Sequence, residues 1–89
     1  MNNYDFYFDN NVLFLEFKDV SQNMIVHNII ADIKDTFPNK QFDIVAKKNI
    51  LGYWSAYDYS KDQSIYCGTT SVKTTKEQIK KYLNEYRKD

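Results

Sequence analysis

Residues 4–17 alternate apolar and polar positions on both sides of the dipeptide Asn10-Asn11. A period of two is the pattern of a β-strand, and asparagine tolerates the positive φ angles of a two-residue hairpin turn. The pattern therefore predicts a β-hairpin that pairs Tyr7 with Phe14. One side of this hairpin is wholly apolar or aromatic and is expected to join the core.

Two segments repeat their apolar residues with the period of an α-helix. Residues 20–37 carry isoleucines four positions apart, follow the candidate N-cap Ser21 and end before Pro38, which disfavours helical geometry in the residue before it. Residues 74–88 carry one apolar stripe on an otherwise charged helix. A capping box is expected at the start of this second helix, formed either by Thr74 with Glu77 or by Thr75 with Gln78.

Between the two helices, the alternation over residues 42–47 predicts a third strand. A second hairpin is expected around residues 60–63, with Ala56 opposite Cys67 and Tyr57 opposite Tyr66. In this register one side of the hairpin is apolar and should be buried. It consists of Trp54, Ala56, Ile65 and Cys67.

The predicted order of elements is ββαβββα. Two one-faced helices and a set of half-apolar strands predict an α+β fold, a two-layer α/β sandwich with both helices packed on one face of a mainly antiparallel sheet. The other face would be open to solvent. Six aromatic side chains are expected to project from it: Tyr7, Phe14, Tyr53, Tyr57, Tyr59 and Tyr66.

The length of 89 residues corresponds to a single domain, 1–89, and the 43% hydrophobic content is enough for a core. The termini, 1–3 and 87–89, are expected to fray. A single cysteine excludes an internal disulfide, and the chain has neither a signal-peptide pattern nor an apolar run of about 20 residues. These features favour a cytoplasmic protein.

Charge is distributed unevenly along a chain whose formal net charge is zero. Two lysines and six carboxylates give −4 over residues 1–37, whereas ten basic and six acidic residues give +4 over residues 38–89. This asymmetry predicts an acidic and a basic patch if the two halves form different surfaces, although the charges can also interleave in the fold. In size and in its lysine- and asparagine-rich composition, the chain resembles small accessory proteins of phages or mobile elements, which suggests a modulator or inhibitor.

Catalytic chemistry is not indicated by the sequence. His27 and Cys67 stand forty positions apart, and a nucleophilic pair of the two, although formally possible, has no local support. The sequence contains no phosphate-binding, dinucleotide-binding or metalloprotease motif. We therefore expect no enzyme activity, no cofactor and no metal site.

The predicted tyrosine face is the candidate site. Tyrosine offers rigid contact area at low entropic cost, so the face favours a non-enzymatic protein-binding module whose partner is another protein or a second copy. The alternative is a nucleic-acid-binding domain in which bases stack on the same rings and lysines contact phosphates or an acidic partner. The candidate lysines are Lys47, Lys48, Lys61, Lys73, Lys76 and Lys80. A third interpretation is that cross-strand tyrosine pairs simply stabilise the sheet. No membrane partner is expected.

Overall fold

The computed structural model describes residues 4–71 and 73–88. The five strands are β1 (Tyr4–Asp9), β2 (Val12–Phe17), β3 (Ile44–Lys48), β4 (Trp54–Asp58) and β5 (Gln63–Cys67). The helices are the 3-10 helix η1 (Val20–Ile25) and the α-helices α1 (Val26–Thr36) and α2 (Lys76–Tyr86). The chain is an α+β domain, and apart from η1 its elements follow the predicted order.

The strands form one sheet in the order β1-β2-β3-β4-β5. Neighbouring strands are antiparallel except for β2 and β3, which are parallel. The prediction of a mainly antiparallel sheet is therefore wrong, because the sheet is mixed. The parallel pair arises because α1 lies between β2 and β3 in the chain, and a helical crossover returns the chain to the end of the sheet where β2 began.

The predicted N-terminal hairpin is confirmed in detail. Tyr7 pairs with Phe14 and Phe8 pairs with Leu13. The turn residues Asn10 and Asn11 have φ angles of 53° and 62°, so both adopt the left-handed conformation that this type of hairpin turn requires.

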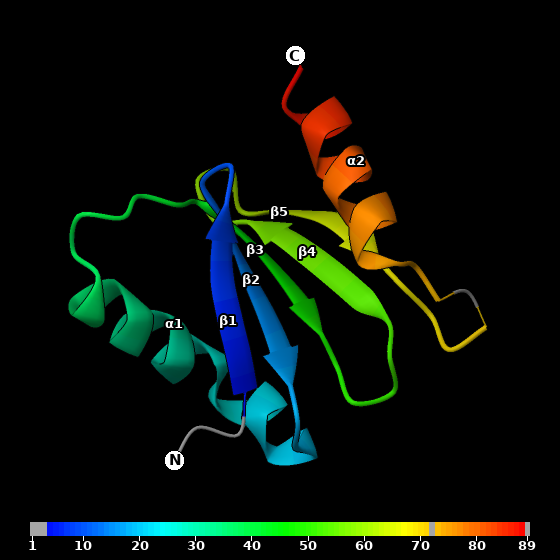
Figure 1. Cartoon of the computed structure of the whole chain (residues 1–89), viewed down its shortest axis with the longest axis horizontal. Coiled ribbons are helices and arrows are strands. Elements are labelled where there is room, and N and C mark those ends of the chain that lie inside the picture. Colours follow the sequence, from blue (N-terminus) through cyan, green and yellow to red (C-terminus); the bar gives the residue numbers. More distant parts are fainter. Residues whose placement is uncertain (1–3, 72, 89) are drawn as a thin grey trace.

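The two α-helices lie on opposite faces of the sheet, so the fold has three layers (Figure 1). The prediction that both helices share one face is wrong. The reason is that the central strands are apolar on both sides: four consecutive residues of β2, Val12–Leu15, and the first three of β3 are buried. Each face of these strands requires its own cover.

Each helix builds a separate core. On one face, four residues of α1 pack against β2 and β3: Val26, Ile29, Ile30 and Ile33. On the other face, Ile79 and Leu83 of α2 pack against a cluster that includes Phe14 and Trp54. Consequently the aromatic residues of the chain are divided between two cores instead of projecting from one open surface.

The first predicted helix is divided in two. Asp19 rather than Ser21 is the N-cap, since its carboxylate accepts a hydrogen bond of 3.1 Å from the Ser21 amide. The segment runs as a 3-10 helix to Ile25 and becomes α-helical at Val26. Because the number of residues per turn changes at this junction, Ile25 does not align with the apolar stripe of α1 and is 47% exposed.

The register of the second hairpin differs from the prediction. Ala56 pairs with Tyr66, and Ser55 pairs with Cys67. A register shift between Ala56 and Tyr57 places Tyr57 opposite Ser64. The predicted Ala56–Cys67 and Tyr57–Tyr66 pairs are therefore wrong, and Tyr66 and Tyr57 lie on opposite faces of the sheet.

The C-terminal helix begins with the second of the two predicted capping boxes. Thr75 accepts a hydrogen bond of 3.2 Å from the Gln78 amide, and the Gln78 side chain accepts one of 2.8 Å from the Thr75 amide. After the helix, Arg87 and Lys88 form a hydrogen-bonded turn. The other residues expected to fray, 1–3 and 89, lie outside the described residues. None of the described helices combines the length and the apolarity needed to cross a membrane.

Candidate binding groove beside helix α1

The six aromatic residues predicted to share one exposed face do not do so. Phe14 is 1% exposed beneath α2, and Tyr7 and Tyr66 pack against the same core. Tyr57 and Tyr59 lie on the side of the sheet that faces α1. Half-buried Tyr53 directly precedes β4. The prediction of a continuous tyrosine face is therefore wrong, because the rings are divided between the two faces of the sheet and α2 covers those of Tyr7 and Phe14.

The rings beneath α2 form a packed aromatic column. Tyr7 stacks on Phe14 with 4.9 Å between ring centroids and an interplanar angle of 3°. Phe14 in turn packs edge-on against Trp54 at 5.9 Å. Their burial and stacking indicate that these rings stabilise the fold.

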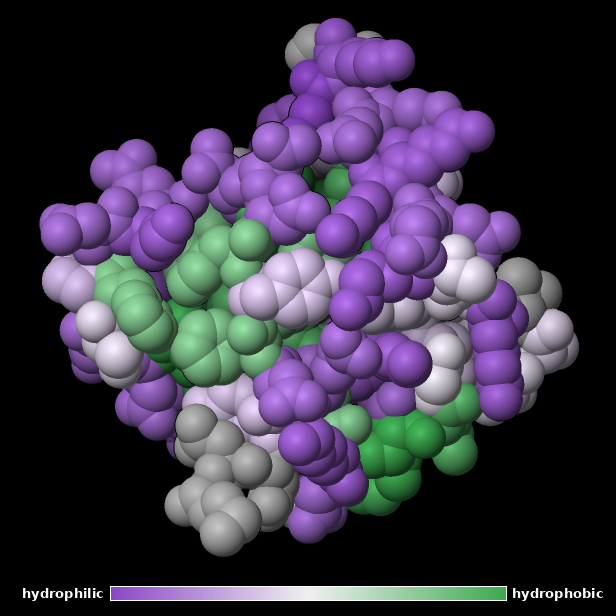
Figure 2. Space-filling model, in the orientation of Figure 1, coloured by the Kyte–Doolittle hydropathy of each residue, from purple (hydrophilic) through white to green (hydrophobic). Residues whose placement is uncertain are grey.

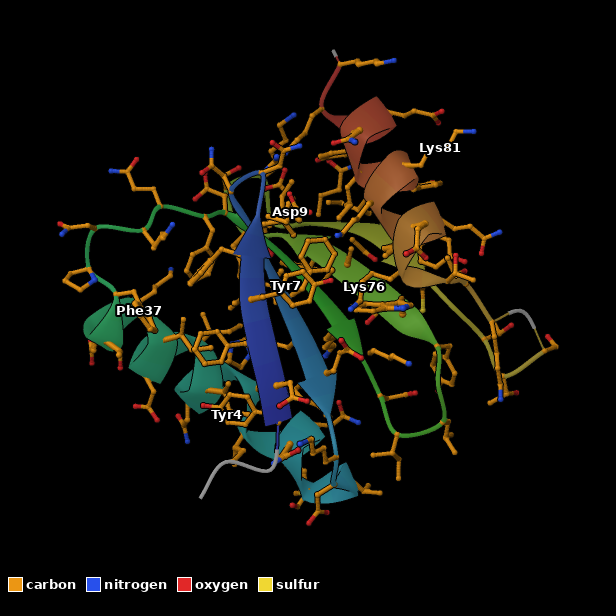
Figure 3. All side chains as sticks on the ribbon, in the orientation of Figure 1. Tyr4, Tyr7, Asp9, Phe37, Lys76 and Lys81 are labelled. Atoms are coloured by element: carbon orange, nitrogen blue, oxygen red, sulfur yellow. The ribbon has the colours of Figure 1, made fainter. Side chains whose placement is uncertain are left out.

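Two lysines of α2, Lys76 and Lys80, lie over this column, and Figure 3 shows Lys76 beside Tyr7. Lys76 Nζ lies 4.8 Å from the Tyr7 ring centroid and 3.3 Å from a carboxylate oxygen of Glu16. Lys80 lies 3.0 Å from Asp9, and this hydrogen bond raises the pKa of the Lys80 ammonium. Partial burial alone would lower the pKa of Lys76, but the hydrogen bond with Glu16 and the neighbouring Tyr7 raise it.

On the opposite side of the sheet, α1 packs over β1, β2 and the start of β3, and a groove of about 450 Å³ lies next to it. The floor is formed by three strands, with Lys47 on β3, Tyr57 on β4 and Cys67 on β5. One wall is α1, through His27. The groove exists because a short helix connecting two adjacent strands covers only the sheet near those strands.

Tyr57 and Tyr59 form the aromatic part of this groove. Their rings pack edge-on with centroids 4.8 Å apart, and Tyr59 packs edge-on against the His27 ring at 6.3 Å. The Tyr57 hydroxyl donates a hydrogen bond to the Asp62 carboxylate, which raises the pKa of that hydroxyl. Burial raises the pKa of Tyr59. Both hydroxyls therefore remain protonated at neutral pH, and the Tyr57 proton is already donated to Asp62.

A buried carboxylate fixes the turn that carries these residues. Asp58 Oδ1 accepts hydrogen bonds from the Ser60 amide at 2.9 Å, the Ser60 hydroxyl at 2.6 Å and the Lys61 amide at 3.2 Å. The hydrogen bonds from Ser60 are the main reason that the pKa of Asp58 is lowered. Sequence reasoning missed this role, although an aspartate followed two positions later by serine is typical of a side-chain-capped turn.

Cys67 and His27 line the same groove, and sequence reasoning did not place them together. Cys67 was predicted to point into the core, but it is exposed because of the shifted register of β5. Its thiol donates a weak hydrogen bond of 3.9 Å to the Gly68 carbonyl. The histidine ring packs against Tyr59.

The six candidate lysines are dispersed over the molecule. Lys47 lines the groove. On the other side of the sheet, Lys48 and Lys76 pair with Glu16, and Lys80 pairs with Asp9. Lys61 lies over the Tyr86 ring, and Lys73 lies next to Gly52. The six lysines therefore do not form one continuous basic surface.

Within residues 4–71 and 73–88, no cluster of three or more histidine, cysteine or acidic side chains is arranged to hold a metal ion. Comparison with known proteins gives no relative: no protein-family model matches the chain, and no curated protein or solved structure matches it. The properties of the groove are therefore the basis for a functional proposal.

Proposed function

We propose that this domain is a non-enzymatic protein-binding module whose binding surface is the groove formed by β3, β4, β5 and α1. The observation that carries the proposal is the pair of packed tyrosines, Tyr57 and Tyr59, in a groove that α1 leaves uncovered. A rigid aromatic pair of this kind supplies contact area at low entropic cost, as at many protein interfaces.

The shape of the groove favours an extended segment of a partner protein. Its floor crosses three strands, and polar side chains of Lys47, Ser55 and Ser64 are placed among the aromatic rings. Such an arrangement suits a peptide with an apolar side chain against the tyrosines and an acidic side chain near Lys47. A module that binds in this way acts by covering a surface of its partner, and modulation or inhibition of that partner is its proposed activity.

Nucleic-acid binding is the weaker alternative. Phosphate recognition depends on several cations that converge on one surface, and its affinity falls steeply with salt. Three of the six candidate lysines instead form ion pairs with Glu16 and Asp9 on the side of the sheet away from the groove. The groove itself presents Lys47 together with the acidic Asp62.

The test is a random peptide library displayed on phage and selected on the immobilised domain. We expect enrichment of apolar–acidic peptides. The affinity of a selected peptide should fall at least about tenfold in the double variant Tyr57→Ser/Tyr59→Ser, which corresponds to a loss of about 1.4 kcal/mol. Tyr82→Ser is the matched control because Tyr82 is 46% exposed on the other side of the sheet. Circular dichroism establishes that each variant is folded.

Cys67 provides an independent reporter of where the peptide binds. Its thiol is exposed and lines the groove, so a bound peptide should slow its modification by a thiol reagent. Peptides that bind equally well to the double variant, or that leave the rate of modification unchanged, would contradict the proposed surface. Binding of a single-stranded oligonucleotide at low salt, without any peptide enrichment, would favour the nucleic-acid alternative.

A further inference from the structure

Strand β1 is one edge of the sheet, and its backbone presents hydrogen-bonding groups outward. The two-residue turn closes on the pair Asp9–Val12, which is hydrogen-bonded in hairpins of this type. Because hydrogen-bonded and non-hydrogen-bonded pairs alternate, Asp5 and Tyr7 also direct their backbone groups toward β2. The amides and carbonyls of Tyr4, Phe6 and Phe8 consequently point away from the sheet. Among the described residues no further strand pairs with β1, and Figure 1 shows β1 as the outermost strand on its side of the sheet.

This edge carries few of the features that commonly prevent edge strands from pairing. Its sequence, YDFYFD, contains neither proline nor lysine, and its six pairs with β2 are regular. The two aspartates are partly neutralised, since Asp5 lies 3.4 Å from Lys18 and Asp9 lies 3.0 Å from Lys80. The opposite edge differs, because the pairing of β5 with β4 contains an irregularity between Ala56 and Tyr57.

The residues with outward backbone groups also carry a half-buried aromatic row. Phe6 packs at 6.1 Å from Phe8, and both contact Phe37, which is 39% exposed after α1. Tyr4 continues the row at 6.3 Å from Phe6. Figure 2 shows this apolar surface over β1 and beside the C-terminal end of α1, and Figure 3 labels Tyr4 and Phe37 at its margins.

We propose that β1 pairs with β1 of a second copy, so that two five-stranded sheets join in a symmetric dimer. An antiparallel register with the two-fold axis at Phe6 uses the outward groups of Tyr4, Phe6 and Phe8 in both copies. In this register the aromatic row of one copy faces that of the other, with Tyr4 opposite Phe8. The dimer is closed, because both β1 edges are consumed and the irregular β5 edges remain outside.

Complementary charges favour a second copy of the chain as the partner of this edge and favour this register over others. Asp5 of one copy lies opposite Tyr7 of the other, and Lys76 covers the Tyr7 ring at 4.8 Å. The Asp5 side chain is 69% exposed, so it can exchange its surface ion pair with Lys18 for a contact with that ammonium. A register centred on Tyr7 would instead set Asp5 against Asp9, two like charges, and place Tyr4 opposite the turn residue Asn10.

Sedimentation equilibrium over a concentration series is the first test, and we expect the wild-type mass to approach that of a dimer. Asp5→Lys should raise the dimer dissociation constant at least about tenfold, because both symmetric contacts change from attraction to repulsion. The added change Lys76→Glu should restore dimerisation. Asp35→Lys, a change on the exposed side of α1, is the matched control for charge. A wild-type mass that stays monomeric throughout the series would overturn the proposal.

Cysteine cross-linking tests the register in a Cys67→Ser background. Phe6→Cys places the two thiols at the two-fold axis, where the Cα atoms of paired residues are about 5.5 Å apart and a disulfide can form. Asp5→Cys places them on residues that are not opposite each other, so its yield of cross-linked dimer should be much lower. Equal yields from both variants, or a dimer whose dissociation constant is unchanged by Asp5→Lys, would exclude the proposed interface.

Discussion

The hydroxyl of Tyr86 donates a hydrogen bond of 2.8 Å to Oδ2 of Asp58, which lies 28 positions earlier in the chain. Asp58 is 4% exposed at the end of β4, and its other oxygen holds the turn that carries Tyr59. One carboxylate thus links α2, on one side of the sheet, to the turn that borders the groove on the other. This bond also raises the pKa of the Tyr86 hydroxyl.

Because the pKa of Asp58 is lower in the folded protein than its usual 3.8, its ionised form stabilises the fold. The sign follows from proton linkage: this contribution is complete above pH 3.8 and is lost as pH falls from there through the lowered value. We expect Asp58→Asn to be less stable than the wild type at neutral pH and to lose less of its remaining stability below pH 3.8. Urea unfolding across this range measures both effects, and parallel pH profiles for the two proteins would contradict the assignment.

Substitution of Phe14 tests whether α2 covers its face of the sheet. Since it is 1% exposed and contacts both Tyr7 and Trp54, Phe14→Ala should lower the free energy of unfolding by about 3–5 kcal/mol. Tyr82→Ala on the exposed side of α2 is the control and should cost at most about 1 kcal/mol. Urea denaturation gives both values. A small effect of Phe14→Ala would mean that α2 does not cover this face.

The hydroxyl of Tyr7 is buried without a hydrogen-bond partner among residues 4–71 and 73–88. Because an unsatisfied buried hydroxyl is destabilising, Tyr7→Phe should leave the free energy of unfolding unchanged or raise it by about 1 kcal/mol. Tyr66→Phe is the matched control, since that hydroxyl bonds with the Thr74 side chain, and its loss should destabilise the fold. Thermal unfolding of the three proteins compares them directly, and a clear destabilisation by Tyr7→Phe would show that the hydroxyl has a partner.

The left-handed turn of the first hairpin provides a fourth prediction. Asn11 has a φ angle of 62°, a conformation that glycine adopts without steric cost and that β-branched residues strongly disfavour. We expect Asn11→Gly to raise the free energy of unfolding by about 0.5 kcal/mol and Asn11→Val to lower it by about 1–2 kcal/mol. Urea unfolding measures the free energy of unfolding of the wild type and both variants. Equal values would show that the turn relaxes to another conformation.

Short-range sequence patterns were sufficient to predict the elements whose hydrogen-bond partners lie close together in the chain. The register of the first hairpin follows from alternation around Asn10-Asn11, because a two-residue turn leaves one pairing in which the faces separate. The start of α2 follows from Thr75 and Gln78, whose side chains satisfy each other's backbone amides without help from the rest of the fold. By contrast, the second hairpin was predicted in the wrong register, because its turn is fixed by three hydrogen bonds to Asp58 that alternation does not reveal.

The sequence by itself determined the α+β class, the order of strands and helices, and the N-terminal hairpin, since these depend on periodicity and turn chemistry between near neighbours. Only the tertiary structure decided which face each helix covers. The apolar run Val12–Leu15 is typical of a strand buried on both faces, but the alternation pattern alone led to the prediction of one open face. In the folded chain Phe14 therefore lies beneath α2, whereas Tyr57 and Tyr59 lie in the groove beside α1. The physical reason is that a one-faced helix can bury its stripe against any apolar surface that the chain allows it to reach, so the choice depends on how all the layers pack together.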